Sequence, residues 1–87
     1  MKLKMYCVYD IKAKVYNRPF YAINEQVMRR MMVTASRDKQ TEVAAHPEDF
    51  YLYYVGEFDD STGEIVVPVS PQVEFKVIDI MEANENA

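Results

Sequence analysis

His46, Glu48 and Asp49 are residues whose types and spacing could bind a metal ion or transfer protons. Pro47 disfavours a helix at His46, and a lone histidine in such a turn usually caps the backbone or faces solvent. The run at 59–63, Asp-Asp-Ser-Thr-Gly, lacks the ligand spacing and the distal glutamate of an EF-hand calcium loop and is typical of a hairpin turn. We therefore expect no metal ion in either segment.

Cys7 is the single cysteine, and it lies among alternating apolar residues near the N-terminus. One cysteine forms no internal disulfide and no multi-cysteine zinc site. The chain has two glycines among 87 residues, which leaves no glycine-rich phosphate loop. We therefore expect a buried structural thiol, no catalytic residue, no cofactor and no enzymatic activity.

Charge is divided unevenly along the chain, whose formal net charge is −4. Residues 1–40 contain nine basic and three acidic residues, a net charge of +6. Residues 41–87 contain one base, Lys76, and eleven acids, a net charge of −10. This asymmetry favours an electrostatic partner. Alternatively, the two halves neutralise each other within one fold or between subunits of a homo-oligomer.

Basic and aromatic residues are interleaved in the first half of the chain. Cations can follow a phosphate backbone while aromatic rings offer bases a surface for stacking. The combination predicts a platform for DNA, single-stranded in preference, made of Lys2, Lys4, Tyr6, Lys12, Lys14, Tyr16, Arg18, Arg29 and Arg30. The alternative is a protein-interaction module whose acidic half contacts a basic protein through Glu48, Asp49, Glu57, Asp59 and Asp60.

Strands and a helix must position these residues. Residues 2–10 alternate with period two, which predicts a strand with Leu3, Met5, Cys7 and Tyr9 toward the core and Lys2, Lys4 and Tyr6 on the other face. Residues 14–16 resume strand character, and Pro19 places that strand at a sheet edge or ends it. Asn24 is a good helix cap, so a helix should run from there to Ser36 or Arg37, followed by a mobile loop over 38–45. Its predicted apolar stripe is Val27, Met28, Met31, Met32 and Ala35.

The second half predicts three more strands. Residues 50–58 would place Phe50, Leu52, Tyr54, Gly56 and Phe58 on one face and Tyr51, Tyr53, Val55 and Glu57 on the other. A return strand at 64–67 and a last strand from Val73 to about Ile80 complete the set. Because both faces of strand 50–58 are aromatic, we expect a homodimer or higher oligomer, with this strand or the methionine stripe in the interface.

The predicted fold is a single α+β domain over residues 1–80, with a flexible tail over 81–87. Its sheet would be small and mainly antiparallel, with four or five strands and one helix, and an OB-like small barrel is the alternative. No apolar run approaches the roughly 20 residues of a membrane span. No signal-peptide stretch follows the N-terminus, so we expect a soluble intracellular protein and no membrane partner.

Two blocks of sequence resemble a known family, the small nonstructural protein of gokushovirus-type microviruses, which are phages with single-stranded DNA genomes. The first block is Met1-Lys2-Leu3-Lys4-Met5-Tyr6 with Val15-Tyr16-Asn17-Arg18-Pro19-Phe20, and the second is His46-Pro47-Glu48-Asp49-Phe50 with Gly56-Glu57-Phe58-Asp59-Asp60-Ser61-Thr62-Gly63. The resemblance implies DNA binding in the cytoplasm of the infected bacterium, at the switch from duplex replication to single-strand synthesis and packaging. A phage or host protein would then be the basic partner of the alternative interpretation.

Overall fold

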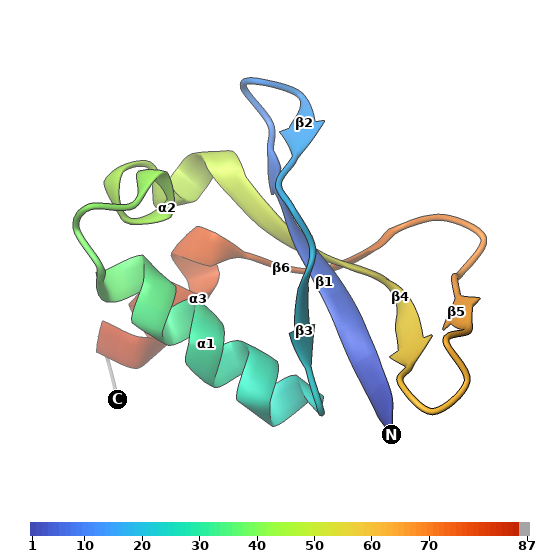
Figure 1. Ribbon diagram of the computed structural model, residues 1–87. Coiled ribbons are helices and arrows are strands. Elements are labelled where there is room, and N and C mark those ends of the chain that lie inside the picture. The colour runs from blue at the N-terminus through green and yellow to red at the C-terminus, as the bar shows by residue number, and fades with distance from the viewer. Residues whose placement is uncertain (86–87) are drawn as a thin grey trace.

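Strand β1 (Lys2–Asp10) is the centre of an antiparallel sheet in the computed structural model, which describes residues 1–85 (Figure 1). It pairs with β2 (Val15–Tyr16) and β3 (Phe20–Ala22) on one edge and along its whole length with β4 (Phe50–Asp59) on the other. The far edge of β4 pairs with β5 (Ile65–Val66) and β6 (Gln72–Lys76). The sheet is open, which confirms the α+β prediction, with six strands in place of four or five, and does not form the alternative barrel.

The helices gather on one face of this sheet (Figure 1). They are α1 (Glu25–Arg37), α2 (Glu42–Ala45), the 3₁₀ turn η1 (Pro47–Asp49) and α3 (Val77–Glu85). The Asn24 side chain accepts a hydrogen bond from the Val27 N–H at 2.8 Å, which confirms the predicted cap. The core between helices and sheet consists of Tyr6, Val8, Ala22, Met28, Met32, Phe50, Leu52, Val77 and Ile80.

Two segments differ from the sequence prediction. The expected loop at 38–45 contains α2, because the Thr41 side chain accepts from the Ala44 N–H at 3.1 Å and starts a helical turn. The last strand ends at Lys76, not near Ile80, because Val77, Ile80 and Met81 recur at helical spacing and pack into the core. The tail expected over 81–87 overlaps α3 as far as Glu85, and residues 86 and 87 lie outside the described part.

A β-bulge in β4 decides which side chains share a face. Met5 pairs with Gly56 but Tyr6 pairs with Tyr54, so Val55 has no partner on β1. The extra residue reverses the alternation beyond it. Leu52, Tyr54 and Glu57 therefore share the helix-side face, while Tyr53, Gly56 and Phe58 share the opposite face. The predicted division of strand 50–58 by odd and even positions was wrong beyond Val55.

In β1 the even-numbered residues face the helices, whereas the sequence predicted that the odd-numbered residues would face the core. Its even residues Tyr6 and Val8 point to the helices and are buried, although they were expected on the outer face. Cys7, on the opposite face, is buried as well, as the sequence predicted. Cys7 is buried without a helix above it because β1 has neighbouring strands on each edge, whose side chains shield it.

Candidate nucleic-acid interface

The sheet face opposite the helices is uncovered by any helix of the described residues (Figure 1). We call it the open sheet face. The strand register assigns to it Leu3, Met5, Cys7, Tyr9, Tyr16, Tyr21, Tyr51, Tyr53, Gly56, Phe58, Ile65, Val73 and Lys76. None of these residues is acidic, and Lys76 is the one with a charge. An uncharged aromatic surface with a single cation does not repel a polyanion.

Three tyrosines form a cluster on this face. The Tyr9 ring centroid lies 4.6 Å from that of Tyr16 and 5.9 Å from that of Tyr53, and Tyr16 and Tyr53 are 5.5 Å apart. Tyr16 is 42% exposed, and burial together with the neighbouring tyrosines raises the pKa of its hydroxyl. The rings hold one another in place, so a base stacking on Tyr16 meets a preformed surface.

Two further aromatic contacts extend the open sheet face along the strands. The ring centroids of Tyr21 and Phe58 are 6.3 Å apart, and Tyr21 is 47% exposed. The Lys76 ammonium lies 5.6 Å from the Tyr51 ring centroid, where it can reach a phosphate beside a stacked base.

The turn between β1 and β2 presents two lysines at its tip. The Asp10 carboxylate accepts hydrogen bonds from the backbone N–H groups of Lys12 (2.9 Å) and Ala13 (3.1 Å). The Lys14 N–H donates to the Asp10 carbonyl at 2.7 Å, and Lys14 itself takes a left-handed backbone conformation, φ +59°. The turn is therefore built by Asp10, and the lysine side chains are left to solvent.

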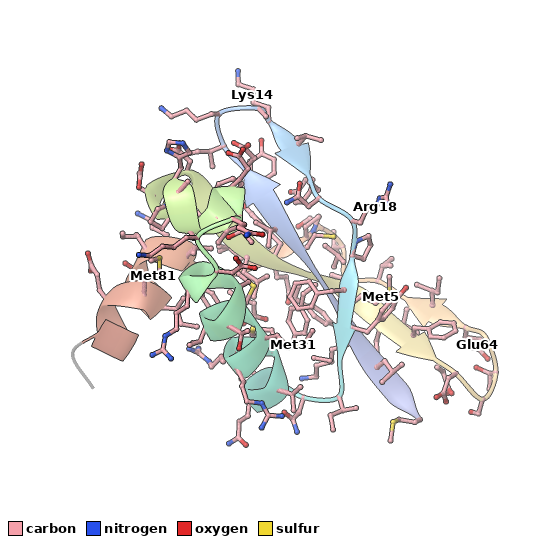
Figure 2. All side chains as sticks on the ribbon, turned by 60° about the vertical axis from the view of Figure 1, so that its left-hand side comes forward. Met5, Lys14, Arg18, Met31, Glu64 and Met81 are labelled. Atoms are coloured by element: carbon pink, nitrogen blue, oxygen red, sulfur yellow. The ribbon has the colours of Figure 1, made fainter. Side chains whose placement is uncertain are left out.

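Arg18 follows β2 and points away from the helices, on the side of the sheet where Met5 lies (Figure 2). We call Lys12, Lys14 and Arg18 the basic hairpin, and Tyr16 lies between its members in the chain. These four predicted site residues are exposed and belong to one end of the sheet. The structure thus brings together less than half of the predicted set.

Lys2 and Lys4 lie elsewhere, on the helix-side face. Lys2 is directly opposite Asp59 and Lys4 is opposite Glu57 in the register of β1 and β4. The Asp59 pKa is lowered, first by hydrogen bonds from Ser61 and to a lesser extent by the N-terminal ammonium and Lys2. Opposite charges across a strand pair attract, so each lysine partly offsets an acid of the other half, although neither pair comes within ion-pair distance.

Tyr6, Arg29 and Arg30 do not belong to the platform either. Tyr6 is 1% exposed, with its ring between those of Phe20 and Tyr54, so the expectation that it stacks on bases was wrong. Arg29 and Arg30 are on α1, which packs on the opposite side of the sheet. Arg29 also contacts Glu25 at 3.6 Å and lies 5.3 Å from the Phe75 ring centroid.

Residues 46–49 and 59–63, the two segments considered for metal binding, have different conformations in the structure. The turn after β4 is the predicted hairpin turn, with Asp59 accepting from the Ser61 N–H at 2.9 Å and Gly63 at φ +77°. His46, Glu48 and Asp49 bring one potential ligand atom each to within 4.8 Å of one another. Two of these side chains are exposed and all come from one turn, so the expectation of no metal ion there stays a prediction.

Sequence reasoning missed Tyr21, Tyr51, Tyr53 and Lys76 as candidates, and it placed Tyr9 on the core-facing side of its strand. Tyr51 and Tyr53 alternate with the core residues Phe50 and Leu52, and that period-two pattern of large aromatics was the signal available. This pattern indicated that both faces of the strand are aromatic. It did not indicate which of the two faces the helices would leave uncovered.

A comparison with known families decides the origin of the chain. The Phage ORF5 protein family matches residues 3–80. The chain belongs to the Phage ORF5 protein family. The match runs from the second residue of β1 into α3, so the basic hairpin and nearly all of the sheet lie within the region that the family shares.

No curated protein and no solved structure matches this chain. Within residues 1–85, no helix is long and apolar enough to cross a membrane.

Proposed function

We propose that this phage protein binds single-stranded DNA with its open sheet face and basic hairpin. The observation that supports this most is the composition of that face. It carries aromatic rings, no carboxylate, and one cation, and it adjoins Lys12, Lys14 and Arg18 at one end. Proteins that bind single-stranded nucleic acid combine cations, which contact the phosphates, with aromatic rings, on which the bases stack.

Single strands fit this surface better than a duplex. In a duplex the faces of the bases are stacked on one another, whereas single-stranded bases can lie on aromatic rings. Tyr16 and Tyr21 are the most exposed tyrosines of the open sheet face, so they are the first candidates for stacking. The basic hairpin and Lys76 then contact the phosphates that connect the stacked bases.

The biological setting follows from the resemblance to gokushovirus-type microviruses. A phage with a single-stranded genome produces single-stranded DNA in the cytoplasm of its bacterial host. We infer that the protein is a nonstructural accessory factor that binds this DNA during the switch from duplex replication to genome synthesis or packaging. It contributes binding and no catalysis.

The test is fluorescence anisotropy of a labelled oligothymidine of about 20 nucleotides, with a duplex of equal length for comparison. Four phosphate contacts, from Lys12, Lys14, Arg18 and Lys76, predict about a 50-fold loss of affinity between about 50 and 200 mM salt, since each contributes about 0.7 to the logarithmic slope. Lys12→Glu with Lys14→Glu should abolish binding. Arg29→Glu with Arg30→Glu changes the net charge equally on the other side of the sheet and should leave most of the affinity.

Tyr16→Ala tests stacking separately from charge. Removing one stacked aromatic typically costs about 1–3 kcal/mol, so the affinity should fall by at least about fivefold with an unchanged salt dependence. Equal losses from both charge-reversal variants, or full affinity in Tyr16→Ala, would contradict the proposed surface. Tighter binding to the duplex would contradict the preference for single strands.

A second copy of the chain is the other proposed partner. Ile65 and Val73 of the open sheet face are more than half exposed, so a homodimer could bury them. Met28 and Met32 of the predicted methionine stripe are buried in the core, which leaves Met31 on the surface (Figure 2). Sedimentation at roughly tens of micromolar should show a dimer or larger species, and a monomer would contradict the prediction.

A further inference from the structure

An acidic pocket of about 330 Å³ lies on the helix-side face of the sheet, beside the first turn of α1. Its charged lining consists of Lys4, Glu25, Glu57 and Glu74. Three carboxylates against one ammonium give this lining a net charge of −2. Glu25 also contacts Arg29 at 3.6 Å, whereas no partner within ion-pair distance is present for Glu57 or Glu74 among the described residues.

The Tyr6 hydroxyl is a second feature of this pocket. Tyr6 lines the pocket although only 1% of the residue is exposed. Its hydroxyl has no hydrogen-bond partner among residues 1–85. Every side-chain polar atom of these residues that is sealed from solvent does have a partner, so the Tyr6 hydroxyl is not sealed. The hydroxyl must therefore reach the pocket. A buried tyrosine hydroxyl usually has a partner, so this one is available to a ligand.

The lining suits an organic cation better than a metal ion. Three potential metal ligands come within 4.8 Å of one another only at His46, Glu48 and Asp49 among the described residues, so the three glutamates of the pocket do not converge on one point. Acceptors spread around a pocket match a group with several N–H donors, such as a guanidinium or an ammonium. The Tyr6 hydroxyl, which stays protonated at neutral pH, can accept one of these hydrogen bonds.

A second acidic pocket adjoins the first. It has a volume of about 210 Å³, is lined by Lys2, Glu57, Asp59, Glu64 and Val66, and shares Glu57 with its neighbour. Its lining also carries more carboxylates than ammonium groups. The exposed Val66 side chain can contact the aliphatic stem of a long cationic side chain. Two acidic pockets with a common wall fit two cations on one extended chain.

We propose that these two pockets bind arginine or lysine side chains from a basic segment of another protein. Charge complementarity and the unpartnered hydroxyl support this occupant. The pockets are on the opposite face of the sheet from the tyrosine cluster, so the inference does not depend on the proposed DNA binding. One chain could hold a nucleic acid and a basic protein at the same time.

The test uses a labelled peptide of about six arginines and measures anisotropy at about 50 mM salt. Glu57→Gln with Glu74→Gln should weaken binding at least about tenfold. Glu42→Gln with Glu82→Gln changes the net charge equally at exposed sites on α2 and α3 and should weaken it less than about twofold. Equal losses in both variants would show diffuse attraction and overturn the proposal.

Tyr6→Phe keeps the packed ring and removes only the hydroxyl, so it tests the pocket even where the double variant unfolds. It should weaken peptide binding by about 10-fold to 150-fold, the effect of one lost hydrogen bond to a charged group. An unchanged affinity would overturn the role of Tyr6. Oligothymidine binding should be unaffected in both pocket variants, which separates this proposal from the first.

Self-association provides the last comparison. The basic hairpin of a second copy could also enter the acidic pockets. If Lys12→Glu with Lys14→Glu and Glu57→Gln with Glu74→Gln both abolish oligomers in sedimentation, the occupant is a second copy and the assignment to another protein is overturned. If oligomers persist in both variants, a second copy does not occupy the pockets, which supports the assignment to another protein.

Discussion

Gly56 follows the bulge in β4 at a point where another strand comes close. A β-carbon added at this position would lie 2.8 Å from the Val66 carbonyl oxygen and 3.2 Å from Val67 Cγ1. The first contact is with backbone, which cannot rotate away as a side chain can. Gly56→Ala must therefore displace β5, and it must do so in a backbone conformation, φ +158°, that other residues rarely adopt.

The expected cost combines overpacking with backbone strain. Each contributes about 1–3 kcal/mol, so Gly56→Ala should reduce the free energy of unfolding by about 2–6 kcal/mol. For a domain of this size about 1 kcal/mol corresponds to roughly 4–8 °C, so the melting temperature should fall by roughly 8 °C or more.

Gly63→Ala is the matched control, because it is the other glycine of the chain. Its φ is +77°, but a β-carbon there would meet no atom within 4 Å. Only the left-handed conformation is penalised, at about 1–2 kcal/mol. Urea unfolding of both variants, followed by circular dichroism, measures the difference. If Gly56→Ala is no less stable than Gly63→Ala, the close approach of β5 to Gly56 is refuted.

Three further predictions concern the core. Leu52 is fully buried, so Leu52→Ala should lower stability in urea by about 2–5 kcal/mol, while the exposed Val69→Ala should stay within about 0.5 kcal/mol; equal effects would contradict the assigned core. Burial, with Glu74 and Glu25 nearby, raises the pKa of Tyr6 from 10.0 to about 12, so the folded chain holds this proton more tightly. Stability should therefore fall as the pH rises from 10 to 12, and Tyr6→Phe, followed by urea unfolding across that range, should flatten the decline. Burial also raises the pKa of Cys7, so iodoacetamide should modify this thiol in urea but not in the folded protein; rapid modification of the folded form would show that β1 is exposed.

Local signals predicted much of the fold. Asn24 begins α1, Gly63 closes the turn after β4, and the alternating residues of β1 and β4 are strands. Each of these depends on neighbours in the chain: a capping side chain, a left-handed glycine, a period-two pattern. The sequence did not predict α2 because its four residues give little periodicity. It did not predict α3 because Val73, Phe75 and Val77 continue a strand pattern up to the point where α3 begins.

The candidate site was only partly predictable for the same reason. Lys12, Lys14, Tyr16 and Arg18 are close in sequence, so one hairpin keeps them together. The prediction also included Lys2, Lys4 and the arginines of α1. To exclude them, one has to know which face of the sheet each residue occupies. That depends on where α1 packs and on one bulged residue, Val55, and neither follows from the residue types alone.

The sequence by itself determined a small α+β domain, a basic hairpin, and an excess of positive charge in the first half with negative charge in the second. These properties depend on residue types and short-range order. Only the tertiary structure decided how the charges meet: β1 and β4 place Lys2 and Lys4 opposite Asp59 and Glu57, while the basic hairpin extends beyond the acids of β4. The physical reason is register, because a shift of one residue moves a side chain to the other face of the sheet. The same register left one face aromatic and free of carboxylates and placed the acids of β1 and β4 on the other.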